Sequence, residues 1–164
     1  MENYMKLEIS ALGENESFAR SVVSAFALSL NPTFTELSDI KTAVSEAVTN
    51  CIVHAYKEKR EGQKILIECR IEKSTNPIFR NGGEGVLHIR ISDNGCGIDD
   101  VEKAILPFYT TLLDDERSGM GFTIMQTFMD EFYLDSQKGK GTVVTMVKRI
   151  GIMENVETRE RANA

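Results

Sequence analysis

Apolar residues in this sequence recur with two different periods, and the order of these periods limits the folds that the chain can adopt. One-by-one alternation of apolar and polar residues predicts a half-buried strand, because successive side chains of a strand point to opposite faces. Residues 5–11, 63–73 and 85–92 show this alternation. Two more strands are predicted at 131–136 and 141–149, joined by the hairpin turn Gly139-Lys140-Gly141.

Between these strands, apolar residues recur every three or four positions, which is typical of a helix with one buried face. A first helix is predicted over 14–30, where Asn31-Pro32 ends it, and a longer one over 33–56. A short helix is predicted at 99–105, and another begins near Met120.

The predicted elements follow the order β-α-α-β-β-α-loop-α-β-β, with the strands grouped into hairpins. This order favours an α+β fold, a two-layer sandwich with helices on one face of a mixed, mostly antiparallel sheet. A chain of 164 residues fits one domain. We place that domain at residues 1–150, followed by a flexible tail at 151–164, and predict long loops at 74–84 and 107–118.

Charge and composition exclude several classes of function. The formal net charge is −6, so direct binding to nucleic acid is not expected. No apolar run is long enough for a membrane span, and the N-terminus lacks the pattern of a secretion signal. The three cysteines, Cys51, Cys69 and Cys96, have no C-x-x-C spacing, so neither a disulfide framework nor a four-ligand zinc site is expected. We expect a cytoplasmic protein.

Within the long helix, Glu46 and Asn50 stand four residues apart, so both side chains can address one ligand. An amide oxygen suits Mg²⁺, and a nearby carboxylate can accept a proton from a hydroxyl that attacks a phosphate. A solvated polar stripe is the alternative explanation for this pair taken alone.

Two glycine-containing segments could also contact a nucleotide. In Asp93-Asn94-Gly95-Cys96-Gly97, a buried carboxylate can accept a hydrogen bond from an adenine amino group, and the glycines allow close approach; an ordinary turn is the alternative. Gly119 and Gly121 lie where a loop becomes a helix, a position whose free N–H groups bind phosphate. Arg117 could add a contact to the γ-phosphate, while a junction without any ligand is the alternative here.

The three segments occur in the order that resembles the N, G1 and G2 boxes of the gyrase, chaperone and histidine-kinase ATPase superfamily. This resemblance implies the Bergerat type of two-layer fold and binding of ATP or ADP with Mg²⁺. Because His54 lies on the helix of Glu46 and His88 in a strand, neither resembles the phosphoacceptor of a histidine kinase. Packing is the simpler explanation for both histidines, and Cys51-x-x-His54 is at most half of a metal site.

The segments at residues 15–20, 45–50 and 116–125 are more narrowly similar to the serine-kinase anti-sigma factors of spore-forming bacteria. The likeness covers roughly residues 5–149. Such proteins are homodimers that bind a sigma factor in the ATP state and phosphorylate a serine of an anti-anti-sigma protein. The insert at 74–85 and the pair Leu112-Leu113 depart from the family pattern.

The resemblance implies a role for each matching residue. Glu46 would be the general base and Asn50 the Mg²⁺ ligand, while Arg20 would dock the sigma factor. The remaining nucleotide contacts would come from Asp93, Gly95, Gly97, Thr110, Arg117, Gly119, Gly121 and Thr142. Two alternatives stay open: a relative that controls a general-stress sigma factor, and a non-catalytic module that sequesters its partner in a nucleotide-dependent way.

Overall fold

The computed structural model describes residues 2–56, 62–74, 85–107 and 119–151. Most of the predicted loops at 74–84 and 107–118, and all but the first residue of the tail, lie outside these ranges. None of the helices in the described ranges has the length and apolar character needed to span a bilayer.

A five-stranded sheet forms one layer, with the strand order β1-β2-β3-β5-β4. Its strands are β1 (Glu2–Ser10), β2 (Lys64–Lys73), β3 (Gly85–Asp93), β4 (Glu131–Gln137) and β5 (Gly141–Ile150). All four pairings between them are antiparallel, so the sheet is more uniform than the predicted mixed one. The reason is that β5 lies between β3 and β4, which run in the same direction and would otherwise be parallel neighbours.

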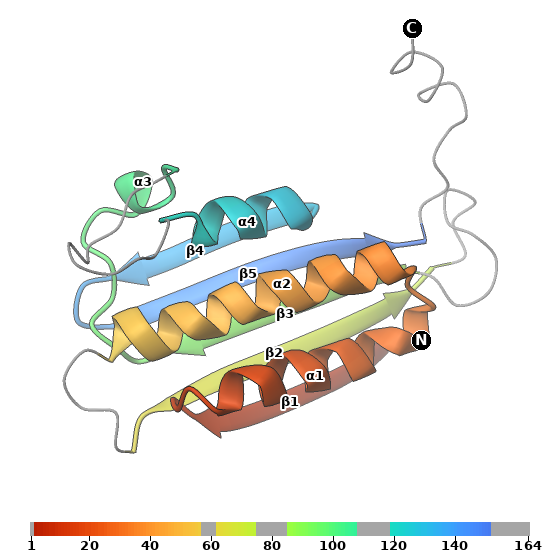
Figure 1. The fold of residues 1–164 in the computed structure, drawn as a ribbon, viewed down its shortest axis with the longest axis horizontal. Coiled ribbons are helices and arrows are strands. Elements are labelled where there is room, and N and C mark those ends of the chain that lie inside the picture. Colours follow the sequence, from red (N-terminus) through yellow and green to blue (C-terminus); the bar gives the residue numbers. More distant parts are fainter. Residues whose placement is uncertain (1, 57–61, 75–84, 108–118, 152–164) are drawn as a thin grey trace, which may run out of the picture.

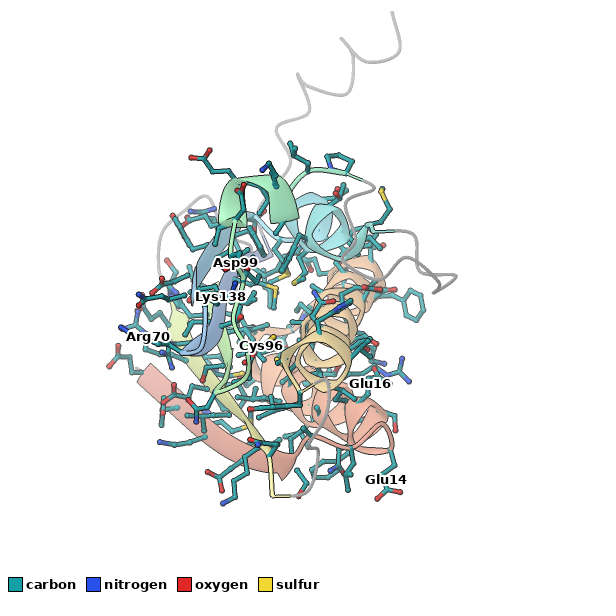
Figure 2. All side chains as sticks on the ribbon, turned by 90° about the vertical axis from the view of Figure 1, so that its left-hand side faces the viewer. Glu14, Glu16, Arg70, Cys96, Asp99 and Lys138 are labelled. Atoms are coloured by element: carbon teal, nitrogen blue, oxygen red, sulfur yellow. The ribbon has the colours of Figure 1, made fainter. Side chains whose placement is uncertain are left out.

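The longer helices form the second layer and lie on one face of the sheet, while the shortest α-helix lies by the edge strand β4 (Figure 1). The helical segments are α1 (Asn15–Ala27), the 3₁₀ turn η1 (Leu28–Leu30), α2 (Phe34–Asn50), the π-helical turn η2 (Cys51–Ala55), α3 (Val101–Ala104) and α4 (Gly121–Phe128). The view along the sandwich in Figure 2 separates the sheet from α1 and α2. The predicted element order and the α+β two-layer fold are confirmed.

Local sequence explains both ends of α2. At its start, the Thr33 hydroxyl accepts a hydrogen bond from the Glu36 N–H, and the Glu36 carboxylate accepts one from the Thr33 N–H at 2.6 Å. This capping box satisfies two N–H groups that a helix start leaves free. At its end, α2 continues into η2 instead of stopping, and the wider π-helical turn carries the helix to Ala55.

The core lies between the two layers. From the sheet come isoleucines of β2 and β3, which alternate with outward-facing polar residues as the sequence predicts. From the helices come Val23, Val44, Val48 and Met125, all fully buried. Burial of these aliphatic side chains contributes roughly 1.5–3 kcal/mol each before the entropy of ordering is counted, and it stabilises the contact between the two layers.

The opposite face of the sheet is polar and explains why β1 begins earlier than predicted. Arg70 Nη1 lies 3.2 Å from Glu2 Oε1, and the Tyr4 hydroxyl donates a hydrogen bond of 2.8 Å to Glu68. These cross-strand contacts pair β1 with β2 from Glu2 onward.

Candidate functional site

Gly121, the first residue of α4, lies directly against the predicted Glu46 and Asn50 pair. A β-carbon added at position 121 would stand 3.1 Å from Glu46 Oε2 and 3.4 Å from both Asn50 amide atoms. Only glycine therefore leaves the present space between the start of α4 and these side chains. Gly119 precedes this start with a φ of 64°, a left-handed conformation that favours glycine.

Asp93 ends β3 and is buried, with 6% of its surface exposed. Its carboxylate accepts a hydrogen bond of 2.8 Å from the Gly95 N–H. Burial raises the pKa of this carboxyl above its ordinary value, while hydrogen bonds from Gly95, Cys51 and Thr142 act in the opposite direction. The structure thus holds a carboxyl group in a largely dry position at the end of the sheet.

The loop after Asp93 is packed so tightly that two of its residues must be glycine. A β-carbon at Gly95 would stand 2.3 Å from the Ala55 carbonyl oxygen in η2. At Gly97, which has a φ of 66°, it would stand 2.1 Å from the Gln137 carbonyl oxygen. The loop is also fastened by the Cys96 N–H, which donates a hydrogen bond of 2.9 Å to Ala55.

Thr142 lies beside Asp93, because these two residues are direct partners in the pairing of β3 with β5. Their side chains therefore point to the same face of the sheet, the face that the helices cover. The Thr142 hydroxyl oxygen lies 2.9 Å from that of Ser136 in β4. Gly141, the residue before Thr142, lies very close to Asp93. A β-carbon added at position 141 would stand 2.0 Å from the backbone oxygen of Asp93.

Cys51 connects the helix pair to this end of the sheet. It directly follows Asn50, is buried, and its side chain hydrogen-bonds to Asp93. Burial, followed by the charge of Asp93, raises the pKa of the Cys51 thiol well above its usual range, so the thiol stays protonated. In Figure 2, Cys96, which belongs to the loop after Asp93, lies beside the end of α2, between the layers. The three predicted segments therefore meet around the end of α2.

Arg20 lies elsewhere, on α1. Its Nε stands 3.7 Å from Glu16 Oε1, and its side chain is 43% exposed. Glu16 also accepts a hydrogen bond from the Ser45 hydroxyl on α2. The structure does not bring Arg20 to the cluster around Asp93, and its role in docking stays a prediction. Thr110 and Arg117, which are predicted to contact the nucleotide, lie outside the described residues.

Sequence reasoning missed three residues that support the cluster: Cys51, Tyr56 and Ser136. Tyr56 is buried, and its hydroxyl accepts a hydrogen bond of 2.9 Å from the Asn94 N–H while donating one of 2.8 Å to the Lys64 carbonyl oxygen. A tyrosine shortly after an Asn-containing helix gives only a weak signal. Cys51 and Ser136 give none, because their contacts depend on how the layers and strands come together. Among the described residues, no group of three His, Cys, Asp or Glu side chains could hold a metal ion.

Comparisons with known proteins identify the family to which this chain belongs. A family model described as a histidine kinase-like ATPase domain matches residues 9–148. A solved structure of the RsbU and RsbW domains of a Mycobacterium tuberculosis protein has a TM-score of 0.59 at 14% identity, covering 92% of this chain and 32% of that one. At that identity the likeness shows the fold alone.

Closer relatives carry the name anti-sigma F factor. The chain is 51% identical over 149 residues to one from Thermoanaerobacter sp. (strain X514), covering 91% of this chain and 95% of the relative. It is 52% identical to one from Caldanaerobacter subterraneus subsp. tengcongensis, with the same coverage. It is 47% identical to one from Clostridium botulinum (strain Alaska E43), covering 93% of this chain and 98% of the relative. The chain therefore belongs to the histidine kinase-like ATPase domain family and, within it, to the family of the anti-sigma F factors.

Proposed function

We propose that this chain is an anti-sigma factor and an ATP-dependent serine protein kinase. It binds and inhibits a sporulation sigma factor, and it phosphorylates the anti-anti-sigma protein that relieves the inhibition. The observation that carries the proposal is the position of Gly121 against Glu46 and Asn50. A carboxylate, an amide and the start of a helix then lie together, and phosphoryl transfer needs groups of these kinds in one place. The names of the close relatives support the anti-sigma role.

The buried end of the sheet receives the adenine base. Asp93 accepts a hydrogen bond from its amino group, with Thr142 beside it, and Gly95 and Gly97 let the backbone pass close to the ring. The phosphates lie against the start of α4. Their contacts come from Thr110, Arg117, Gly119 and Gly121.

Glu46 accepts the proton of the attacking serine hydroxyl, while the oxygen of Asn50 is the protein ligand for Mg²⁺. The donors fit this ion, because Mg²⁺ prefers oxygen ligands and is commonly held by one or two protein groups together with phosphate oxygens and water. When bound, Mg²⁺ neutralises charge on the phosphates. Orientation of the nucleophile and removal of its proton remain the work of the protein side chains.

The proposal extends to the rest of the chain. Residues 1–150 form the ATP-binding kinase domain and 151–164 a flexible tail. The protein works as a homodimer in the cytoplasm, where transcription takes place, and Arg20 on the exposed side of α1 contacts the sigma factor. It acts on transcription through proteins and not by binding nucleic acid itself.

Phosphotransfer from radiolabelled ATP to the cognate anti-anti-sigma protein tests the kinase. Glu46→Gln should abolish the transfer while calorimetry still detects ATP binding, because the amide keeps the shape of the side chain but cannot take a proton. Glu8→Gln is the matched control, since Glu8 pairs with Lys64 on the sheet face away from the helices. Its transfer rate should equal that of the wild type.

The same experiment separates the alternatives. If no protein receives the γ-phosphate while sigma-factor binding still prefers ATP over ADP, the chain is a non-catalytic sequestering module. If Glu46→Gln turns over normally, Glu46 is not the base. Capture of sigma factors from a lysate of the source organism, followed by mass spectrometry, distinguishes a sporulation sigma factor from a general-stress one.

A further inference from the structure

Three polar side chains form a row across the end of the sheet on its helix-covered face. Asp93 of β3 is the direct partner of Thr142 of β5, which is in turn the direct partner of Ser136 of β4. The next row inward consists of Ile91, Val144 and Leu134 and is apolar. The polar row thus marks the place where the core gives way to the predicted base site.

The Ser136 hydroxyl uses its complete hydrogen-bonding capacity within this structure. Its oxygen accepts a hydrogen bond of 2.9 Å from the Ile98 N–H, and its proton goes to the Gly141 carbonyl oxygen at 2.9 Å. The Thr142 hydroxyl is its third partner, also at 2.9 Å. A serine hydroxyl has a single proton to donate and two lone pairs to accept with. With its proton committed to Gly141, Ser136 can only accept from Thr142, so Thr142 is the donor of that bond.

This assignment fixes what Thr142 can offer to a ligand. With its proton directed at Ser136, the Thr142 oxygen presents only lone pairs elsewhere, next to the acceptor carboxylate of Asp93. Two neighbouring acceptors match the 6-amino group of adenine, which carries two N–H donors. They do not match a 6-oxo purine, which presents a carbonyl oxygen at that position and would meet unpaired acceptors.

We propose that Ser136 is a positioning residue that holds the Thr142 hydroxyl as an acceptor and so increases the preference of the site for 6-amino over 6-oxo purine nucleotides. The inference rests on the proposed function, in which the base lies at Asp93. It adds a specificity determinant that does not itself touch the base. Ser136 acts through Thr142, and at the same time it ties the loop after Gly97 to β4 through Ile98.

Binding of Mg-ATP and Mg-ITP, measured by calorimetry, tests this proposal. The two nucleotides share ribose and phosphates and differ in the six-membered ring of the base, so the ratio of their dissociation constants isolates recognition there. Ser136→Ala should lower the preference for ATP about fivefold to tenfold, the size of one net hydrogen bond. The reason is that the freed Thr142 hydroxyl can turn and donate to the 6-oxo group.

Further variants separate positioning from a merely structural effect. Ser136→Thr keeps the hydroxyl and should restore the preference. Thr142→Val removes the hydroxyl that Ser136 orients and should also lower the preference. The double variant should lower it no further than Thr142→Val alone, because Ser136 acts on the base only through that hydroxyl. Ser92→Ala is the matched control: Ser92 lies next to Asp93 in β3 but on the other face, and its ratio should equal that of the wild type.

An unchanged ratio in Ser136→Ala, or additive losses in the double variant, would overturn the inference. If Ser136→Ala does not fold, Thr142→Val decides, since a full preference for ATP without that hydroxyl also overturns it. Asp93→Asn distinguishes a failure of the proposed base site from a failure of the proposed role of Ser136. Normal ATP binding in Asp93→Asn refutes the proposed base site itself, whereas lost ATP binding there with an unchanged Ser136→Ala ratio refutes only the role of Ser136.

Discussion

Lys148 Nζ stands 3.0 Å from Asp39 Oδ2 and so joins the last strand of the sheet to α2. The same ammonium group donates a hydrogen bond of 2.7 Å to the carbonyl oxygen of Phe128, the last residue of α4. One side chain therefore holds the far end of the helix whose first residue lies against Glu46. Lys148 therefore supports the site from the opposite end of α4 and is not itself part of the site.

Lys148→Met should destabilise the protein, because it leaves the Asp39 carboxylate without its cation and the Phe128 carbonyl without its donor. Only 12% of the Lys148 side chain is exposed, so water replaces these contacts poorly. We expect a loss of roughly 1–3 kcal/mol in the free energy of unfolding. Urea denaturation measures it as a lower midpoint at an unchanged slope.

Lys138→Met is the control for this prediction. Lys138 also forms a short ion pair, with Asp99, but its side chain is 74% exposed. Exposed pairs contribute about 0–1 kcal/mol. Equal losses in the two variants would mean that the burial of Lys148 has no energetic consequence.

Gly121→Ala should impair the site while leaving the fold intact. The added methyl group would stand 3.1 Å from a carboxylate oxygen at the flexible end of Glu46, which can move by a few tenths of an ångström. Alanine also favours helix over glycine, so stability should hold. Displacement of Glu46 should slow phosphotransfer about tenfold or more, since catalytic geometry tolerates little error. The measurement is a single-turnover assay.

The control is Gly13→Ala, where an added β-carbon has no neighbour within 4 Å. Its rate should match that of the wild type. A normal rate in Gly121→Ala would mean that the carboxylate of Glu46 needs no fixed position for the reaction.

The sequence predicts the order of the elements and the Glu46 and Asn50 pair better than it predicts the residues that support the site. Periodicity predicts the element order, because a strand and a helix bury different sets of neighbours along the chain. The spacing of Glu46 and Asn50 predicts that they share a helix face for the same local reason. Cys51 and Ser136 could not be found in this way. Their partners, Asp93 and Thr142, are distant in the chain and become neighbours only through layer packing and strand register, which no local pattern encodes.

Two glycines near the β4–β5 turn should respond differently to alanine. Gly139 has a φ of 76° but open space around it, whereas Gly141 has a φ of 90° and would direct a β-carbon to within 2.0 Å of the Asp93 oxygen. Gly139→Ala should therefore cost only the left-handed strain, roughly 1–2 kcal/mol. Gly141→Ala should cost about 3 kcal/mol or more, because β3 and β5 must also move apart.

Urea unfolding of both glycine variants checks the difference, and ATP calorimetry shows where it arises. Because Gly141 lies against Asp93, its variant should also lose ATP affinity, while Gly139→Ala should retain it. Equal stabilities would indicate that the strands adjust to the extra carbon without strain.

Stability should depend on pH through Asp93 in an unusual direction for a carboxyl group. Burial raises its pKa in the folded protein above the ordinary value of 3.8 that it has in an unfolded chain. Between the two values the folded state binds more protons than the unfolded state, so the free energy of unfolding decreases as the pH rises. The contribution of Asp93 to stability is most favourable at pH values below its pKa in the unfolded chain. Its full cost is reached at pH values above its pKa in the folded protein.

Asp93→Asn removes this titration and should therefore gain stability relative to the wild type as the pH rises from about 4 to 7. Because all other groups are shared, the difference between the two proteins isolates Asp93. Urea unfolding of both at a series of pH values measures it. A constant difference would mean that the hydrogen bonds from Gly95, Cys51 and Thr142 fully offset the burial. Asp93 would then be a structural turn residue that is stable as a carboxylate. Its burial would no longer support a role as a dry carboxyl group that binds the base.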